Sequence, residues 1–426
     1  MAEIIPFNAI RYNPETVNDL SRVICPPYDI ISPERQKFFH DASPYNLIHM
    51  ELGLDVPGED KYERAGNYFR DLLAKQVLVR DKSPALYFYS QEYSLNREKH
   101  GRAGFLALLR LEERKSSVFG HEHTHLEPKE DRLRLIRKVQ ANLSPIFVIF
   151  ADRKKAVAQT LTPAIKGADP CIDIVDDEKT CHRLWRIDAP DVLEKVRSKM
   201  EQENIFIADG HHRYEVACAY RDEMKKSLGE RYTGKESFNY VLAYFTNIDA
   251  QGLTVLPIHR LVKLSVKPDM AAVIRGLTVQ FSVEEVRDRR RFFFLLAKAG
   301  MAEHVIGLYT DKKCWLLRLR NVKFLDKVMA DKPAEYRSLD VAILNSLILD
   351  EVLKVDPQDK NSVIFSAQAD ELLSACDSDS TRMAFFLNPT KVDQIMAVAL
   401  KGEKMPPKST YFYPKVASGL VIHKHE

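Results

Sequence analysis

Apolar positions along the chain follow two spacings, one typical of strands and one typical of helices. Residues 205–207 form a short apolar run. Beyond residue 214, apolar side chains recur at helical intervals, at Val216, Ala217, Tyr220 and Met224. Between the two patterns stand Asp209 and Gly210, a pair that favours a tight turn. The pattern therefore predicts a strand, a turn and a helix in immediate succession.

The same periodicities predict further elements on both sides of this segment. Helices are expected over residues 62–73, 128–139, 341–352 and 392–400, and a short helix is expected after Ser32. Strands are expected over residues 85–93, 102–111, 146–150, 240–245 and 384–387, the first two as a hairpin. Residues 151–200 are expected to form a helical, loop-rich connector. Strands mixed with helices in this way predict an α/β (mixed α+β) fold.

Length and composition favour a globular protein with more than one domain. The chain has 426 residues, more than one ordinary hydrophobic core organises, and its pattern becomes more regular from about residue 265. We therefore predict two domains, residues 1–264 and residues 265–426. Hydrophobic residues make up 45% of the chain and charged residues 29%. The 63 basic and 60 acidic residues leave a net charge of +3, so nucleic acid is not an expected partner.

Targeting and membrane signals are not evident in the sequence. Met1 leads into Ile4, Ile5 and Pro6 without the basic and apolar regions of a signal peptide. No apolar run approaches the ~20 residues that a membrane span needs. The six cysteines are scattered, without a CxxC pair. We therefore expect a cytoplasmic protein without a membrane partner, and a homo-oligomer is left open.

The predicted turn at Gly210 carries an unusual set of charges. His211, His212 and Arg213 follow it, at the start of the predicted helix. That end of a helix is the positive end of its dipole, so cationic side chains there are unfavourable on their own. A bound anion, usually a phosphate, would remove the conflict. The alternative is a capped helix with neutral histidines and a surface arginine. Asp209 likewise has two interpretations, a metal-binding carboxylate or a turn residue that caps the helix.

Residues 121–125, His-Glu-His-Thr-His, form a second cluster whose side chains could take part in catalysis or bind a metal. Their letters match the zinc-protease motif H-E-x-x-H, which requires both histidines on one face of a helix. Gly120 precedes the cluster, Pro128 follows it, and no apolar periodicity crosses it. We therefore expect no helix and disfavour zinc proteolysis. In an extended chain, His121, His123 and His125 would share one face.

Several other polar residues could reach a shared site. His259 and Arg260 stand at a predicted strand end and could converge on the same anion. Residues 405–415 hold Lys408 and Lys415 between prolines, and either a loop covering a site or a terminal strand fits this composition. A P-loop does not fit, because Pro407 replaces a glycine and has no N–H for a phosphate. Residues 25–29 could present Tyr28 and Asp29 to a site, or form a structural corner. The basic residues of the helix at 128–139 are expected on a solvated face, namely Arg132, Arg134, Arg137 and Lys138.

These motifs together resemble the family called domain of unknown function 1015. The resemblance extends along almost the whole chain and rests on Cys25-Pro26-Pro27-Tyr28-Asp29, Arg102-Ala103-Gly104-Phe105, His121-Glu122-x-Thr124, Asp131-Arg132-Leu133, Asp209-Gly210-His211-His212-Arg213-Tyr214 and residues 405–415. The family pattern His-Glu-x-Thr matches His121, Glu122 and Thr124. It leaves His123 and His125 outside the pattern, which further disfavours a zinc protease.

The segment Asp209–Arg213 also resembles, over about a dozen residues, the phosphate-binding segment of the ParB/sulfiredoxin-like superfamily. That superfamily includes CTP-hydrolysing partition proteins, sulfiredoxin and free-serine kinases. The resemblance implies a ParB/sulfiredoxin-like N-terminal part that binds a nucleotide, followed by a second α/β part. It also implies that Arg213 contacts phosphate.

Three hypotheses of function follow. The first is a phosphotransferase that uses ATP or ADP with Mg²⁺ and a small hydroxyl acceptor. The resemblance to free-serine kinases makes L-serine one candidate acceptor. The second is a phosphatase or nucleotidase that uses the same anion pocket, with water as the nucleophile. The third is a non-catalytic nucleotide-binding switch of the ParB type.

The first hypothesis assigns a role to each candidate residue. Glu122 is the candidate base, Asp29 is its substitute, and His121 belongs to the same catalytic group. Asp209 is the candidate metal ligand. The candidate phosphate- or nucleotide-binding residues are Gly210, His211, His212, Arg213, His259, Arg260, Lys408 and Lys415.

Overall fold

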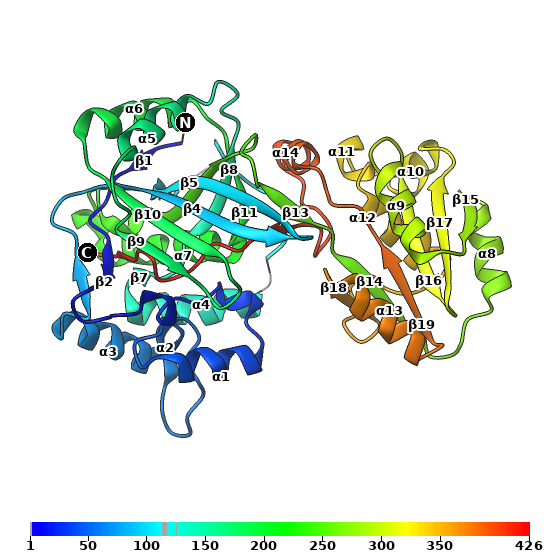
Figure 1. The fold of residues 1–426 in the computed structure, drawn as a ribbon, viewed down its shortest axis with the longest axis horizontal. Helices are drawn as coiled ribbons and strands as arrows, with labels where there is room; N and C mark the ends of the chain where they lie inside the picture. The colour runs from blue at the N-terminus through cyan, green and yellow to red at the C-terminus, as the bar shows by residue number, and fades with distance from the viewer. Residues whose placement is uncertain (1, 113–116, 125) are drawn as a thin grey trace. The chain divides into compact units, whose positions relative to one another are not determined.

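Residues 2–112, 117–124 and 126–426 are described in the computed structural model of the chain (Figure 1). Their contacts define two units. Unit 1 contains residues 1–120, 124–253 and 414–426, and unit 2 contains residues 121–123 and 254–413. Unit 2 therefore interrupts unit 1 along the chain. The sequence predicts two independently folding domains, residues 1–264 and 265–426. Units defined by contacts do not test independent folding, so these domains stay a prediction.

A mixed sheet forms the centre of unit 1 (Figure 1). Its described strands are β1 (Ile4–Ile5), β4 (Leu86–Leu95), β5 (Glu98–Arg110), β6 (Val118–Gly120), β8 (Ile146–Phe150), β9 (Ile172–Val175), β10 (Cys181–Ile187), β11 (Ile205–Asp209) and β12 (Tyr240–Asn247). The order across the sheet is β6–β11–β8–β12–β5–β4–β10–β9, and β1 also pairs with β5. β11 runs parallel to β6 and β12 runs parallel to β8, whereas β11 and β8 are antiparallel.

Helices cover the sheet of unit 1 and build two apolar clusters. The helices are α1 (Pro33–Ala42), α2 (Ile48–Glu51), α3 (Lys61–Ala74), α4 (Leu126–Val139), α5 (Ala156–Ile165), α6 (Pro190–Met200) and α7 (His211–Leu228). Val157 of α5 and Val196 of α6 pack with alternate residues of the central strands, such as Val148. A second cluster joins α1, α2, α3 and α4 through side chains such as Phe39, Phe69 and Leu135.

The last residues of the chain belong to unit 1. β21 (His423–Lys424) pairs with β7 (Ala141–Asn142), and β2 (Ile10–Tyr12) pairs with β3 (Leu78–Arg80). Isolated bridges also join Ile422 to Ile10 and Ser418 to Cys25. Residues 414–426 are therefore held by segments from several parts of unit 1.

Unit 2 contains an antiparallel sheet in the order β15–β17–β16–β19–β14–β18. These strands are β14 (His259–Lys263), β15 (Phe281–Val286), β16 (Val305–Thr310), β17 (Lys313–Leu319), β18 (Val363–Ser366) and β19 (Arg382–Phe386). β13 (Thr254–Leu256) pairs separately with β20 (Tyr411–Tyr413). The helices are α8 (Met270–Thr278), α9 (Arg289–Ala299), α10 (Lys323–Val328), α11 (Ala334–Arg337), α12 (Asp340–Ile343), α13 (Ala369–Ser378) and α14 (Val392–Leu400).

The mixed α/β class predicted from the sequence is confirmed, and so are most of its elements. The predicted strand, turn and helix are β11, Gly210 and α7, and the predicted hairpin is β4 with β5. Within residues 405–415, the strand alternative holds for β20. The helix predicted at 341–352 begins as α12 but continues as a π-helix over Leu344–Asp350.

The connector predicted over residues 151–200 is wrong. Besides α5 and α6 it contains β9 and β10, and β10 pairs with β4 along its whole length. The sequence concealed this strand because polar residues occupy both of its faces. His182 is buried there through hydrogen bonds to the Tyr89 hydroxyl (2.6 Å) and the Asp176 carboxylate (3.0 Å).

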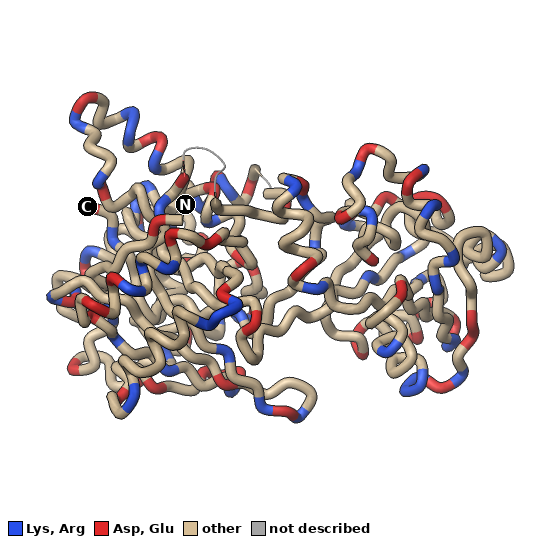
Figure 2. Tube along the Cα trace, turned by 90° about the horizontal axis from the view of Figure 1, so that it is seen from above, with Lys and Arg blue, Asp and Glu red and all other residues tan. Residues whose placement is uncertain are grey.

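Charge and hydropathy of the described residues agree with the composition. Figure 2 shows basic and acidic residues interspersed along the trace of each unit. Within the described part of the chain, no helix has both the length and the apolar character that crossing a membrane requires.

Candidate anion-binding site

A β-bulge at the end of β11 sets the direction of the Asp209 side chain. Ile205 and Ile207 pair with Phe150 and Val148 and lie in the core cluster. A regular ladder would next place Asp209 opposite Ile146, on the same buried face. The register instead shifts after Ile207, and Asp209 pairs with Phe147. The extra residue thus turns the carboxylate away from the apolar core.

Gly210 makes the turn from β11 into α7. Its φ of 87° lies in the left-handed region, which glycine adopts without steric cost. A Cβ atom here would also stand 3.0 Å from the Arg213 guanidinium. The first turn of α7 then closes through a hydrogen bond from Tyr214 N to Gly210 O (3.0 Å). Glycine therefore permits both the turn and the position of Arg213.

Asp209 is in contact with two cations. Arg213 Nη2 lies 3.0 Å from Asp209 Oδ2, and Lys415 Nζ lies 2.7 Å from Asp209 Oδ1. Arg213 also donates to the Pro145 carbonyl. The side chains of Arg213, Asp209 and Lys415 are only 10%, 15% and 11% exposed. Two residues about 200 positions apart along the chain thus meet at the first turn of α7.

Buried polar contacts hold the backbone of Lys415 in place. Arg102 is buried, its guanidinium lies 4.6 Å from the centre of the Phe147 ring, and it donates to the Pro414 carbonyl (2.6 Å). Arg102 also donates to the side chain of Gln91, and Gln91 Nε2 donates to the Lys415 carbonyl (2.9 Å). Arg102 belongs to one of the family motifs, and this arrangement gives that motif a structural role in positioning Lys415.

Arg132 is a second buried arginine in this region, and the prediction of a solvated position for it is wrong. Arg134, Arg137 and Lys138 do have exposed side chains. Arg132 lies on the same helix face as the buried Leu135 and Val139, so its side chain points inward. Its guanidinium donates to the Glu51 carbonyl (2.6 Å) and to Asp131 (2.5 Å).

Arg132 and Arg213 line one small cavity of about 50 Å³, together with Glu51, Asn142 and Ser144. Tyr28 covers Arg132, with the guanidinium 4.2 Å from the ring centre. Burial raises the pKa of Tyr28 to about 12, while the charges of Arg132 and Arg213 act in the opposite direction. Asp29, next to Tyr28, is exposed. The cavity is therefore a small recess in which two arginines stand among aliphatic and polar side chains.

The chain itself compensates the cations of this region. Arg213 and Lys415 share Asp209, whereas Arg132 pairs with Asp131 and lies 3.8 Å from a carboxylate oxygen of Glu51. The N-terminal end of α7 contributes a further partial positive charge beside Arg213. An incoming anion can gain from these cations only if it takes the place of the Asp209 carboxylate or arrives with a cation of its own. His211, which is buried, and His212, which is half-buried, follow on the same turn.

In unit 2, His121 and Glu122 contact the segment that follows α14. His121 is buried, its Nε2 lies 3.1 Å from the Thr410 hydroxyl, and its carbonyl accepts from Met405 N (2.8 Å). Thr410 Oγ1 donates to Glu122 (3.3 Å). Thr124, by contrast, belongs to unit 1 and donates to Glu215 of α7 (2.5 Å). The His-Glu-x-Thr pattern therefore has one part in each unit.

His259 and Arg260 are also in unit 2, and backbone groups occupy much of their polar surface. His259 Nδ1 accepts from Leu387 N (3.2 Å), and burial lowers the pKa of His259 to about 4. Arg260 donates to the carbonyls of Ile258 and Lys408, the latter at 2.9 Å, and burial lowers the pKa of Arg260 to about 9. The Lys408 side chain is exposed. His259 is therefore neutral near pH 7 rather than a cation for phosphate.

The described residues contain no group of three or more His, Cys, Asp or Glu side chains placed to hold a metal ion. His121 and His123 are not helical, as expected, and His125 lies outside the described residues. Asp209 offers one carboxylate. One carboxylate can hold a metal ion only together with other ligands, such as the phosphate oxygens that often accompany carboxylates around Mg²⁺.

The fold and this site define a mixed α/β protein with a charged strand–turn–helix at the end of its main sheet. Residues 4–342 match the model of the family described as "Protein of unknown function (DUF1015)". The chain belongs to that family, which confirms the resemblance found in the sequence. A search of curated proteins found no match.

Several solved structures are similar to the chain at low identity. SbnI with a C-terminal truncation, from Staphylococcus aureus, is 13% identical, with a TM-score of 0.37, covering 75% of this chain and 87% of that one. A free serine kinase variant in complex with ADP is 11% identical, with a TM-score of 0.34. The match covers 72% of this chain and 94% of that one. A second variant of free serine kinase, in complex with AMP, is 11% identical, with a TM-score of 0.34. The match covers 71% of this chain and 89% of that one.

Proposed function

We propose that this protein is a phosphotransferase that moves a phosphoryl group from a nucleotide, ATP or ADP, to a small hydroxyl metabolite. One observation carries the proposal: Arg213, on the first turn of α7, and Lys415 meet at Asp209, the last residue of β11. Buried Arg132 lines the same recess as Arg213. A helix N-terminus with converging arginine and lysine side chains is a common way to hold phosphate groups.

In the proposed reaction, the acceptor oxygen attacks the transferred phosphorus. The new O–P bond forms while the bond from phosphorus to the leaving nucleotide oxygen breaks, and the acceptor proton passes to a carboxylate. Arg213, Lys415 and the start of α7 neutralise the charge on the phosphates. Mg²⁺, when it arrives with the nucleotide, would supply further neutralisation, and Asp209 would hold it.

The ion pairs of Asp209 give this residue a second role. Without ligand its single carboxylate pairs with both Arg213 and Lys415 and offsets one of their two positive charges. Phosphate oxygens would replace it at these two cations, which releases Asp209 to become a metal ligand. The site would thus favour a nucleotide carrying its metal over either ion alone, because the phosphates would pair with Arg213 and Lys415 while the metal ion pairs with the released Asp209 carboxylate.

Two carboxylates are candidates for the base. Glu122 belongs to the His-Glu-x-Thr pattern and already accepts a hydrogen bond from Thr410 (3.3 Å). Asp29 is exposed and follows Tyr28, the residue that covers Arg132. L-serine is the first acceptor to test, because the segment Asp209–Arg213 resembles that of the free-serine kinases. Each choice is separable by experiment.

The proposal is tested by incubating the protein with ATP or ADP, Mg²⁺ and pooled hydroxy-amino acids, and analysing the products by mass spectrometry. A phosphorylated amino acid supports the phosphotransferase. Free phosphate formed without an acceptor would instead indicate a phosphatase or nucleotidase. Nucleotide binding without turnover would indicate a regulatory switch of the ParB type.

We expect Arg213→Ala to weaken nucleotide binding by about 100-fold or more, because it removes a charge-assisted contact from a partly buried site. The fold should persist, since Asp209 keeps its ion pair with Lys415. Calorimetric titration with ATP and Mg²⁺ measures the affinity, and circular dichroism checks the fold. Lys226→Ala, which removes an exposed cation near the other end of α7, is the matched control. Equal affinity in the Arg213 variant and the control would refute the phosphate assignment.

We expect Glu122→Gln to keep nucleotide affinity and to lower turnover by ~10²-fold or more, the usual contribution of a general base. Asp29→Asn is the parallel variant, and the base is the residue whose loss lowers kcat at unchanged affinity. If both variants turn over at the original rate, neither carboxylate accepts the proton and the base assignment fails.

A further inference from the structure

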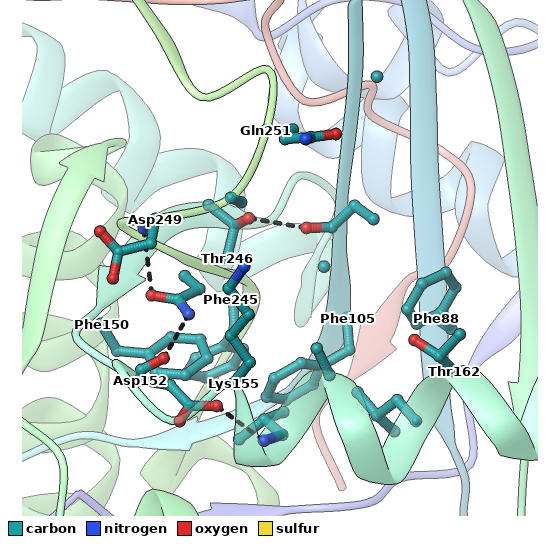
Figure 3. A pocket seen from close by; sticks show the side chains of 18 residues that line it. Phe88, Phe105, Phe150, Asp152, Lys155, Thr162, Phe245, Thr246, Asp249 and Gln251 are labelled. Atoms are coloured by element: carbon teal, nitrogen blue, oxygen red, sulfur yellow. Dashed lines mark hydrogen bonds between the residues drawn. The ribbon is translucent and has the colours of Figure 1, made fainter.

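A second cavity, of about 340 Å³, lies between α5, the middle of β5 and the ends of β8 and β12 in unit 1 (Figure 3). Its volume is in the range of sites that hold a small molecule. It is separate from the Asp209 site, because the two lie at opposite ends of β8. Pro145, just before β8, accepts from Arg213, whereas Phe150 at the far end lines the cavity. Five strand residues separate these points by about 16 Å.

Aromatic and aliphatic side chains line this cavity. Phe105, Phe150 and Phe245 are core residues at its base, each at most 2% exposed, and the half-buried Phe88 offers an accessible ring. Phe105 and Phe245 stack with ring centres 4.8 Å apart and planes 7° apart, and Phe150 meets Phe105 edge to face. Val157 and Leu161 of α5 close the opposite side. This surface suits a flat or branched apolar group of the size of an amino-acid side chain.

Charged side chains of both signs stand at the rim. Figure 3 shows Asp152, Asp249 and Lys155 on the side of Phe150, with Phe88 and Thr162 at the other side. Asp152 is buried and accepts from Val157 N (2.7 Å) at the start of α5. Lys155 and Asp249 are exposed, and neither the ammonium of Lys155 nor the carboxylate of Asp249 makes an ion pair or side-chain hydrogen bond with a described residue. The rim therefore offers one cation and one anion for a ligand.

We propose that this cavity binds an apolar α-amino acid. The ligand carboxylate would meet Lys155, its ammonium would meet Asp249, and its side chain would fill the space beside Phe88 and Ala103. A simple amine or a simple carboxylic acid complements only one of the two rim charges, and an apolar molecule complements neither. L-serine lacks the apolar group, so this site is distinct from the acceptor site of the proposed phosphotransferase and does not depend on it.

The test uses the full chain and L-phenylalanine as the probe, measured by calorimetry. We expect saturable one-to-one binding, weakened about tenfold or more by Lys155→Asn and by Asp249→Asn, since each removes one charge-assisted contact. Asparagine suits position 155 because the backbone there has a φ of 52°. Lys154→Asn, an exposed neighbour that does not line the cavity, is the matched control and should bind as the original chain does.

Two analogues and one variant complete the test. 3-Phenylpropionate lacks the ammonium and 2-phenylethylamine lacks the carboxylate, so each should bind about tenfold or more weakly than L-phenylalanine. Arg213→Ala should leave L-phenylalanine binding unchanged, which separates this proposal from the proposed phosphotransferase. Absence of saturable binding, equal affinity for all three probes, or unchanged affinity in both rim variants would overturn the proposal.

Discussion

Two cations approach the single carboxylate of Asp209, Arg213 at 3.0 Å and Lys415 at 2.7 Å. At the scale of single residues, polar partners likewise hold other buried arginines of unit 1. Arg132 is held by Asp131 and the Glu51 carbonyl, and Arg102 by Gln91 and the Pro414 carbonyl. His259 takes the other route and is neutral, because burial lowers its pKa to about 4. Buried titratable groups of this second kind make stability depend on pH.

We expect the free energy of unfolding to fall as the pH is lowered from about 7.5 to about 5. In the folded chain His259 has a pKa of about 4, against an ordinary value of 6.5. Between these values the unfolded chain binds a proton that the folded chain does not. Stability is therefore highest above the unfolded pKa and is lost as the pH falls toward the folded one. This single group accounts for ~2 kcal/mol over the interval, measurable by urea unfolding.

The variant His259→Asn isolates this effect, because an amide oxygen can still accept from Leu387 N but does not titrate. Its stability should vary less with pH than that of the original chain, by roughly the same ~2 kcal/mol. His423, whose pKa burial also lowers to about 4, should account for part of the remaining dependence. An identical pH dependence in the two proteins would contradict a neutral buried His259.

At the scale of elements, the site depends on how β11 ends and α7 begins. The apolar run and the Asp-Gly pair were sufficient to predict the strand, the turn and the helix, because each has a local cause in residues 205–224. The bulge could not be predicted, since it arises from pairing with β8 and leaves no mark on the β11 sequence. Without that bulge the Asp209 carboxylate would face the apolar core.

Gly210→Ala tests the turn. We expect a loss of about 1 kcal/mol in stability, because alanine is strained at a φ of 87°. We also expect weaker nucleotide binding, because the new Cβ would stand 3.0 Å from the Arg213 guanidinium and displace it. Chemical denaturation and calorimetric titration measure the two effects.

Gly167→Ala is the matched control for that variant. Its φ is 76°, and no atom lies within 4 Å of the added Cβ. Both variants should therefore lose a similar amount of stability, while only the Gly210 variant should lose affinity. If the two variants bind nucleotide equally well, the position of Arg213 does not depend on Gly210.

At the scale of the whole molecule, the sequence was sufficient for the mixed α/β class and for the family, but not for the contacts that complete the candidate site. Lys415 was a predicted phosphate ligand, yet nothing in residues 405–415 shows that it meets Asp209. The burial of Arg132 was missed because it stands in a run of basic residues. Its neighbours Arg134 and Arg137 are indeed exposed. The helical register of Arg132 with Leu135 and Val139 was the signal that could have revealed it. Such contacts join segments distant along the chain, and periodicity within one segment does not encode them.

The interruption of unit 1 by residues 254–413 also sets an order of events during synthesis. A ribosome makes the chain from the N-terminus, and folding usually begins with the parts that emerge first. Most of unit 1 is thus made early, but it must wait for all of residues 254–413 before residues 414–426 can join it. The partner of Asp209 is therefore supplied late, and the unit that starts to fold first is the one that finishes last. A nascent chain therefore carries Asp209 without its Lys415 ion pair until Lys415 emerges.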